Sequence, residues 1–220
     1  MHGMHWIYWL AWLFFRALYR LYFRWRVFHP EHVPMTGRAI LASNHASALD
    51  PPLVAAALDR QIVCLARETL FRFPPLGWLL RNWGVVPLDR DGGSAAGLRV
   101  ILDRLHDGNA IVLFPEGTRT LDGKLQPARA GIGFIAIKSD APVVPVRVFG
   151  TFEACGKGVH LPRPRRVIVK YGEPLRFERL RAEATTASKA RLKEIYQEVA
   201  DEILRAIARL EPCRDKAALP

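Results

Sequence analysis

The stretch RAILASNHASALDPP, residues 38–52, joins a short apolar run, a polar loop and the start of a helix. Arg38 to Ser43 has the length and apolar content of a buried strand. Asp50, followed by two prolines, is typical of a helix N-cap with proline at the first helical position. The polar residues between them are therefore expected on a loop at the carboxyl end of a strand, where α/β sheets commonly build sites.

Apolar runs of strand length alternate with helical patterns along the rest of the chain. Further strands are expected at 62–66, 84–88, 110–114, 143–149 and 166–171, and helices at 53–58, 68–83, 94–106, 130–138 and 186–210. This alternation predicts an α/β fold with a mostly parallel or mixed sheet. Because 220 residues support one substantial core, we expect an N-terminal helical segment, 1–30, and a single α/β domain, 31–220.

The charge balance favours a polyanionic partner. The chain has 32 basic and 21 acidic residues and a net charge of +11, which suits nucleic acid, an anionic membrane surface or phosphorylated substrates. Nucleic acid is disfavoured because no recognition motif is present. Cys64, Cys155 and Cys213 form no Cys-x-x-Cys pair, and no local histidine cluster is evident. Neither a disulfide framework nor a metal site is therefore predicted, and the oligomeric state has no signature in the sequence.

The N-terminal residues combine an apolar run with regularly spaced arginines. Residues 6–15 are uncharged and as a helix span roughly 15 Å, about half of a ~30 Å hydrocarbon core. Arg16, Arg20 and Arg24 follow among aromatic residues. This pattern is typical of a helix lying in an anionic membrane interface; the alternative is a core-packing helix with a solvated arginine face. No cleaved signal peptide is expected, so we expect peripheral or monotopic attachment at the cytoplasmic face of the cell membrane.

His45 and Asp50 are the candidate catalytic residues. An imidazole with an ordinary pKa of about 6.5 accepts and returns protons near neutral pH, and Asp50 is suited to orient the ring and stabilise the imidazolium. A turn must bring them together, because five residues of regular helix place them on different sides. The alternatives are that Asp50 only caps a helix and that His45 is a buried structural residue.

The nucleophile is expected to be the substrate. Ser43 and Ser47 lie close to His45, but neither sits in Gly-x-Ser-x-Gly, so the nucleophile elbow of α/β hydrolases is missing. His45 is then expected to activate a substrate hydroxyl directly. A P-loop and Gly-x-Gly-x-x-Gly are also absent from the sequence, which argues against a nucleotide site.

A second motif, FPEGTR at residues 114–119, is suited to phosphate. Gly117 lets the backbone approach a ligand, and the Arg119 guanidinium matches phosphate in a bidentate manner. For Glu116 two roles stay open: it pairs with Arg119 to fix the loop, or it touches substrate.

Further basic residues are candidates for binding the same phosphate. Arg90 follows an expected strand, and Lys124 and Arg129 lie in a turn-rich loop. The alternative for each is a solvated surface charge.

Four ordered blocks resemble the glycerolipid acyltransferase family, of the 1-acylglycerol-3-phosphate acyltransferase type. They are Asn44-His45-x4-Asp50 and residues 84–90, 114–119 and 143–146. The resemblance implies that His45 is the base, that Asp50 is its partner, and that the acceptor is bound by Arg90, Glu116, Gly117 and Arg119. It also implies a thioester donor, acyl-CoA or acyl-carrier protein, and no metal or organic cofactor.

The expected function is transfer of a fatty acyl group to the sn-2 hydroxyl of lysophosphatidic acid at a membrane surface, giving phosphatidic acid. Other acceptors stay open: glycerol-3-phosphate, another lysophospholipid or an amino-acid lipid. An alternative from another class is a non-catalytic anionic-lipid-binding protein, although it gives no reason for the pairing of His45 with Asp50.

Overall fold

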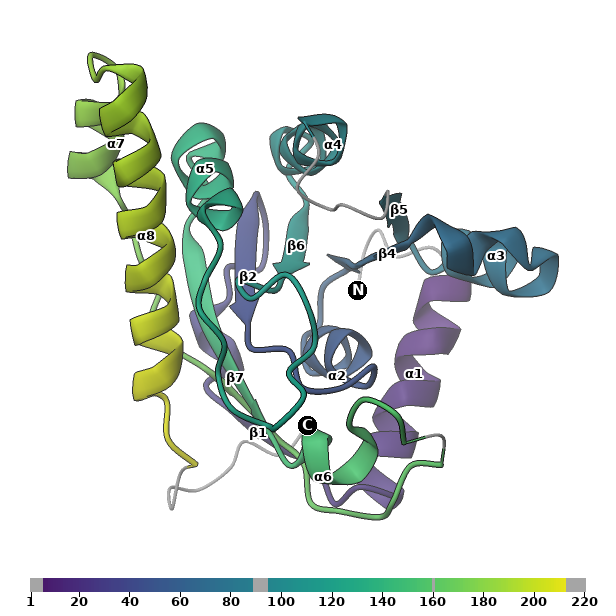
Figure 1. The fold of residues 1–220 in the computed structure, drawn as a ribbon. Helices are drawn as coiled ribbons and strands as arrows, with labels where there is room; N and C mark the ends of the chain where they lie inside the picture. Colours follow the sequence, from purple (N-terminus) through teal and green to yellow (C-terminus); the bar gives the residue numbers. More distant parts are fainter. Residues whose placement is uncertain (1–5, 89–94, 160, 213–220) are drawn as a thin grey trace.

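The computed structural model describes residues 6–88, 95–159 and 161–212 and is built around a six-stranded sheet (Figure 1). The strand order is β1-β8-β7-β2-β6-β3, and neighbours are parallel except β7 and β8, which are antiparallel. The strands are β1 Arg26–Phe28, β2 Ala39–Ser43, β3 Ile62–Val63, β6 Ala110–Leu113, β7 Val143–Phe149 and β8 Ile168–Tyr171. A small parallel sheet pairs β4 Leu65–Arg67 with β5 Val86–Leu88. The predicted α/β fold with a mixed sheet is confirmed.

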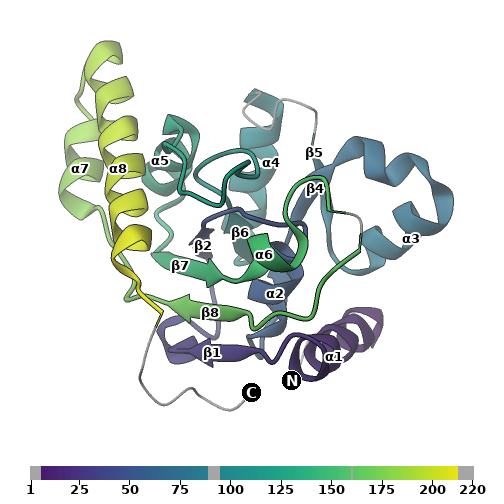
Figure 2. The same cartoon turned by 60° about the horizontal axis from the view of Figure 1, so that its bottom comes forward.

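Helices cover both faces of the main sheet (Figures 1 and 2). Alternate residues of β2 show this division: Leu41 packs in one apolar cluster with Leu53, whereas Ile40 packs in a second with Ile135 and Ile203. The first face carries α1 Trp6–Leu21 and α2 Asp50–Ala56; the second carries α4 Ala95–His106, α5 Ala130–Ser139 and α8 Lys189–Arg209. The remaining elements are η1 Pro30–His32, η2 Glu68–Arg72, α3 Pro74–Asn82, α6 Thr151–Cys155 and α7 Glu178–Ala184.

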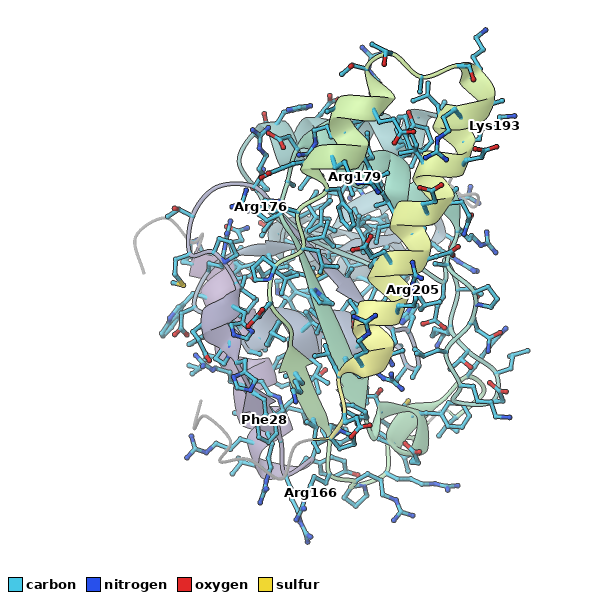
Figure 3. All side chains as sticks on the ribbon, turned by 90° about the vertical axis from the view of Figure 1, so that its left-hand side faces the viewer. Phe28, Arg166, Arg176, Arg179, Lys193 and Arg205 are labelled. Atoms are coloured by element: carbon cyan, nitrogen blue, oxygen red, sulfur yellow. The ribbon has the colours of Figure 1, made fainter. Side chains whose placement is uncertain are left out.

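The C-terminal helix α8 packs closely on α5. A Cβ added to Gly133 of α5 would lie 1.8 Å from the backbone oxygen of Tyr196, so only glycine permits this approach. The expected apolar stripe of α8 is fully buried at Ile195, Val199, Ile203 and Ile207, as the spacing of three and four requires. Figure 3 views this helix from the outside, where Lys193 and Arg205 are exposed.

Two expected elements are divided in the structure. The strand expected at 62–66 splits at Cys64: β3 pairs with β6, whereas β4 joins β5 in the small sheet. The helix expected at 68–83 breaks at Phe73, which is extended (φ −82°, ψ 109°). Pro74 explains the break, because proline disfavours helical geometry in the residue before it.

The N-terminal helix is shorter than the arginine spacing suggests. It ends at Leu21, and Arg24 lies beyond it with a φ of 48°. The prediction that Arg24 continues a helical stripe is therefore wrong. The chain then forms β1, an edge strand parallel to β8 that the sequence analysis did not expect. None of the helices within the described ranges combines the length and the apolar character needed to cross a bilayer.

The connections place a topological switch point at the carboxyl ends of β2 and β6. These strands are parallel neighbours, with Ala42 opposite Leu113. The chain leaves β2 into α2 on one face of the sheet and leaves β6 towards α5 on the other. Such a reversal is the position at which open α/β sheets bind ligands. The loops that carry His45 and Glu116 begin at this point.

Candidate active site

His45 and Asp50 are in direct contact, as the sequence predicts. His45 Nδ1 lies 3.0 Å from Asp50 Oδ2, and the His45 side chain is 17% exposed whereas that of Asp50 is fully buried. Because Nδ1 faces a carboxylate, it carries the proton, and Nε2 keeps the lone pair that a general base needs. The ring stacks on Phe114 with the centroids 3.9 Å apart, which restrains its rotation. The pair therefore has the geometry of an oriented base.

The prediction that Asp50 is the N-cap of its helix is wrong. It is the first residue of α2, and Leu49 is the cap. Its Oδ2 instead accepts from the N–H groups of Ala46 (2.6 Å) and Ser47 (2.7 Å) in the preceding turn. Asp50 Oδ1 is buried and has no hydrogen-bond partner within the described part of the chain. One carboxylate oxygen thus closes the turn and orients the imidazole.

Glu116 fixes the second loop to the first. Its Oε1 accepts from the His45 N–H (2.8 Å), and its Oε2 accepts from the Gln126 N–H (2.9 Å). The Thr120 N–H donates to the His45 carbonyl oxygen at 2.9 Å. Burial raises the pKa of Glu116 above its usual value, and the two backbone N–H groups oppose that rise. These are the contacts of a residue that positions His45.

The ion pair considered for Glu116 and Arg119 does not form. Both Glu116 oxygens bind backbone groups. Arg119 is half-buried and makes no hydrogen bond or ion pair with any residue in the described ranges. Its guanidinium is therefore available for an anionic ligand.

Gly117 and Arg129 are brought together within this loop. Gly117 has a φ of +70°, and a Cβ there would lie 2.9 Å from Arg129 Cδ. Glycine is thus required both by the left-handed backbone and by the packing of the arginine stem. The Arg129 N–H also donates to the Pro115 carbonyl oxygen at 2.9 Å, so the start of α5 is joined to the loop.

Lys124 and Arg90 are the remaining candidate phosphate-binding residues. Lys124 is exposed, and its N–H donates to Asp122 Oδ1 at 3.0 Å. Arg90 lies outside the described residues. The strand before it, β5, borders a cavity of about 410 Å³ whose lining includes Arg72 and Arg81. The structure thus joins His45, Asp50, Glu116, Gly117 and Arg129 through contacts, and leaves Lys124 at the surface.

The two serines beside His45 are committed to structural hydrogen bonds. Ser47 Oγ donates to the Cys155 carbonyl oxygen (2.6 Å) and accepts from the Leu49 N–H (3.1 Å). Ser43 Oγ donates to the Asn44 carbonyl oxygen at 3.1 Å. Both residues are fully buried. This agrees with the expectation that His45 activates a substrate hydroxyl.

Several residues that hold the site were not assigned a role from the sequence. Asn44 exchanges two hydrogen bonds with the backbone of Val148 in β7: its Nδ2 donates at 3.2 Å and its Oδ1 accepts at 2.8 Å. Phe114 and Thr120 contact His45 from the opposite loop. The local sequence contains no signal for these contacts, because each joins segments far apart in the chain.

The chain is similar to known acyltransferases. A family model described as Acyltransferase matches residues 24–149, which include both loops. A 1-acyl-sn-glycerol-3-phosphate acyltransferase from Limnanthes douglasii is 35% identical over 144 residues, covering 63% of this chain and 50% of that protein. One from Bacillus subtilis is 27% identical over 180 residues, covering 77% and 87%. The chain spans about half the length of the Limnanthes proteins that it matches.

A solved structure is also similar. The crystal structure of the 1-acyl-sn-glycerophosphate (LPA) acyltransferase PlsC from Thermotoga maritima matches with a TM-score of 0.70 and 26% identity. The match covers 94% of this chain and 81% of that protein. Because the family model spans more than half of the chain, including both loops of the site, the chain belongs to the acyltransferase family.

Proposed function

We propose that this protein transfers a fatty acyl group from acyl-CoA or acyl-carrier protein to the sn-2 hydroxyl of lysophosphatidic acid at the cytoplasmic face of a membrane. The product is phosphatidic acid. The observation that carries the proposal is the contact between His45 Nδ1 and buried Asp50 beside a loop with an available arginine. The names of the relatives support the choice of acceptor.

The proposed reaction is a direct acyl transfer. His45 Nε2 takes the proton of the acceptor hydroxyl, and the hydroxyl oxygen attacks the thioester carbonyl carbon. The tetrahedral intermediate collapses, the carbon–sulfur bond breaks, and the departing thiolate takes the proton from His45. The Asp50 carboxylate stabilises the imidazolium between these steps.

Recognition of the acceptor phosphate is assigned to the loop that follows β6. Arg119 is half-buried and has no anionic partner among the described residues. A charge-assisted contact in a partly desolvated position is stronger than one in open water. We propose Arg119 as the main phosphate ligand, with Arg90, Lys124 and Arg129 adding positive charge, Gly117 letting the loop backbone approach the ligand, and Glu116 positioning the loop.

The function is tested by incubating purified full-length protein with labelled acyl-CoA or acyl-carrier protein and a panel of acceptors. The panel contains lysophosphatidic acid, glycerol-3-phosphate, lysophosphatidylcholine and monoacylglycerol. Lysophosphatidic acid is expected to be preferred. Equal use of monoacylglycerol would contradict phosphate recognition, and an absence of transfer to every acceptor would leave the non-catalytic lipid-binding alternative.

Arg119→Ala is expected to raise KM for lysophosphatidic acid about 10–100-fold, because a charged hydrogen bond is worth roughly 1.5–3 kcal/mol. KM for the acyl donor should change little. Steady-state kinetics with each substrate varied in turn measures both constants. Lys124→Ala is the matched control, since that side chain is exposed on the same loop and should give a smaller effect. A parallel rise in both KM values would show that the loop has collapsed.

An exposed apolar surface supports attachment to a membrane. On α1, the residues that pack inwards alternate with others that face solvent. The large exposed ones are Trp6, Trp9, Leu10, Leu13, Phe14 and Leu21, and around η2 and α3 they are Leu70, Phe73 and Trp78. The two groups are neighbours, since the ring of Phe15 in α1 contacts Trp83 at the end of α3 (centroids 5.6 Å apart), and Figure 1 shows α1 and α3 on the same side.

The arginines in and just after α1 have different surroundings. Arg16 Nη1 lies 2.8 Å from Asp59 Oδ1, and its guanidinium sits over the Trp12 ring. Arg16 therefore ties α1 to the domain. Arg20 and Arg24 are exposed beside the apolar surface, where lipid headgroups attract arginine. We propose that α1 serves both as a packed helix and as the membrane-facing element.

The double substitution Leu10→Glu and Phe14→Glu is expected to abolish co-sedimentation with vesicles at every salt concentration, because it places charge in the apolar surface. Arg20→Gln with Arg24→Gln should weaken binding to anionic vesicles roughly fivefold per arginine, from about 1 kcal/mol each, and should reduce its salt dependence. Met35→Glu, at an exposed apolar residue outside α1 and α3, is the control. If the double glutamate variant sediments like the unaltered protein, the membrane-facing surface lies elsewhere.

A further inference from the structure

A cluster of potential metal ligands lies at the end of β1, away from the active site. Phe28, labelled in Figure 3, ends β1, and the chain turns at His29 into the 3-10 helix η1. β1 is parallel to β8, β8 is antiparallel to β7, and β7 is parallel to β2. β1 therefore runs in the opposite direction to β2. As a result, the carboxyl end of β1 and the loop that carries His45 lie at opposite ends of the strands.

The side chains of this turn converge. The ligand atoms of His29, Glu31 and His32 all lie within 4.8 Å of one another. His29 Nδ1 and Glu31 Oε1 are 3.1 Å apart, close to the separation of about 3.3 Å between two ligands of a tetrahedral zinc ion with bonds near 2.0–2.1 Å. The two imidazole rings are stacked nearly parallel, with an interplanar angle of 12° and centroids 5.1 Å apart. Glu31 is exposed and both histidines are partly exposed, so an ion can reach the three side chains from solvent.

His32 is held as a metal-binding histidine usually is. Its Nδ1 lies 3.2 Å from the carbonyl oxygen of Tyr171. A carbonyl only accepts, so Nδ1 carries the proton. Nε2 is then directed away with its lone pair free in the neutral ring, which is the orientation that a backbone carbonyl gives to zinc-bound histidines. Tyr171 is fully buried, and its hydroxyl donates to Val54 O at 2.7 Å, so the accepting carbonyl belongs to a fixed part of the core.

The backbone at His29 supports the same assignment. Its φ of 56° is in the left-handed region, which costs a non-glycine residue free energy and tends to occur at functional positions. This conformation turns the chain so that His29 faces Glu31 and His32. Sequence inspection shows only His-Pro-Glu-His and predicts no metal site; the convergence arises from the turn.

We propose that His29, Glu31 and His32 bind a divalent transition metal ion, with zinc the best match to two imidazoles and one carboxylate. Water completes the coordination, because the site is open to solvent on one side. The ion ties the β1 turn to the end of β8 through His32 and Tyr171. Since no such site forms in the unfolded chain, binding stabilises the fold.

The test is a zinc titration of the full-length protein in competition with a chromogenic chelator at neutral pH. His2 and His5 lie outside the described residues and are replaced by alanine throughout, so that they cannot contribute. One zinc ion is expected per chain. His32→Gln, and His29→Asn, which tolerates the left-handed backbone, should each lower the affinity at least 10-fold. His106→Gln, at an exposed histidine of α4, and His45→Ala should leave it unchanged.

Two further measurements separate loss of the ligand from loss of the fold. Glu31→Gln alters an exposed side chain and should fold normally while weakening zinc binding. Zinc at about 100 times its Kd should raise the Tm of the unaltered protein by roughly 5–10 °C and should not raise that of His32→Gln. If His29→Asn, Glu31→Gln and His32→Gln each bind zinc as tightly as the protein that keeps all three residues, the proposal is overturned, whatever the outcome of the acyl-transfer assays.

Discussion

Replacing His45 with alanine is expected to lower kcat by about 10²–10⁴-fold, the usual effect of removing a general base. The imidazole is oriented on one side by Asp50 and stacked on the other against Phe114. No other titratable side chain in the described part of the chain hydrogen-bonds to Asp50 Oδ2, so there is no substitute base in the same position. Single-turnover and steady-state assays with lysophosphatidic acid measure the loss.

The fold should tolerate this substitution. His45 uses its backbone, not its ring, to bind Glu116 and Thr120, and alanine keeps both of those bonds. The Tm and vesicle binding of His45→Ala should therefore stay close to those of the unaltered protein. Near-normal turnover by this variant would remove His45 from the mechanism.

Asp50→Asn is expected to lower kcat by a comparable factor, about 10²–10⁴-fold, because it removes the charge that stabilises the imidazolium. The amide oxygen must occupy the position of Oδ2, since two backbone N–H groups point there. The new NH₂ group then takes the place of Oδ1, where no hydrogen-bond partner is present among the described residues. An unsatisfied buried donor costs roughly 1–3 kcal/mol of stability.

The comparison of kcat with the free energy of unfolding tests this assignment. Urea denaturation should show the modest loss of stability, and kinetics on the folded fraction should show the much larger loss of turnover. Asp103→Asn, at an exposed aspartate of α4, serves as the control for removing one carboxylate charge. If folded Asp50→Asn keeps its turnover, the carboxylate only closes the turn.

Elements with strong local signals were predictable. The strands at 39–43 and 143–149 agree closely with expectation, because the first is buried throughout and the second is buried at every position except Arg147 and Phe149. Helix α8 agrees because its apolar residues recur at helical spacing. The same holds for the contact between His45 and Asp50, which lie within one short segment, so the turn that joins them is local.

Contacts between distant segments were not predictable. The strand β1 consists of three residues and exists because β8 offers it a partner. The role of Glu116 depends on backbone groups at positions 45 and 126, which only the adjacency of β2 and β6 brings together. Arg16 was expected to face lipid, yet Asp59, three residues beyond the end of α2, binds it. A single sequence shows the residue types but not which of them meet.

The contacts between α1 and α2 limit how the proposed membrane-facing surface can be removed by engineering. Trp12 Nε1 donates to Leu58 O just beyond the end of α2, and the buried Tyr19 hydroxyl donates to Leu49 O, one residue before Asp50. Burial raises the pKa of Tyr19, and the charge of Asp50 raises it further, so this hydroxyl stays a donor. Cutting off α1 would leave both carbonyls without donors and release the catalytic turn. The proposed membrane-facing surface is therefore better removed by substituting the outer side chains of an intact α1 than by truncation.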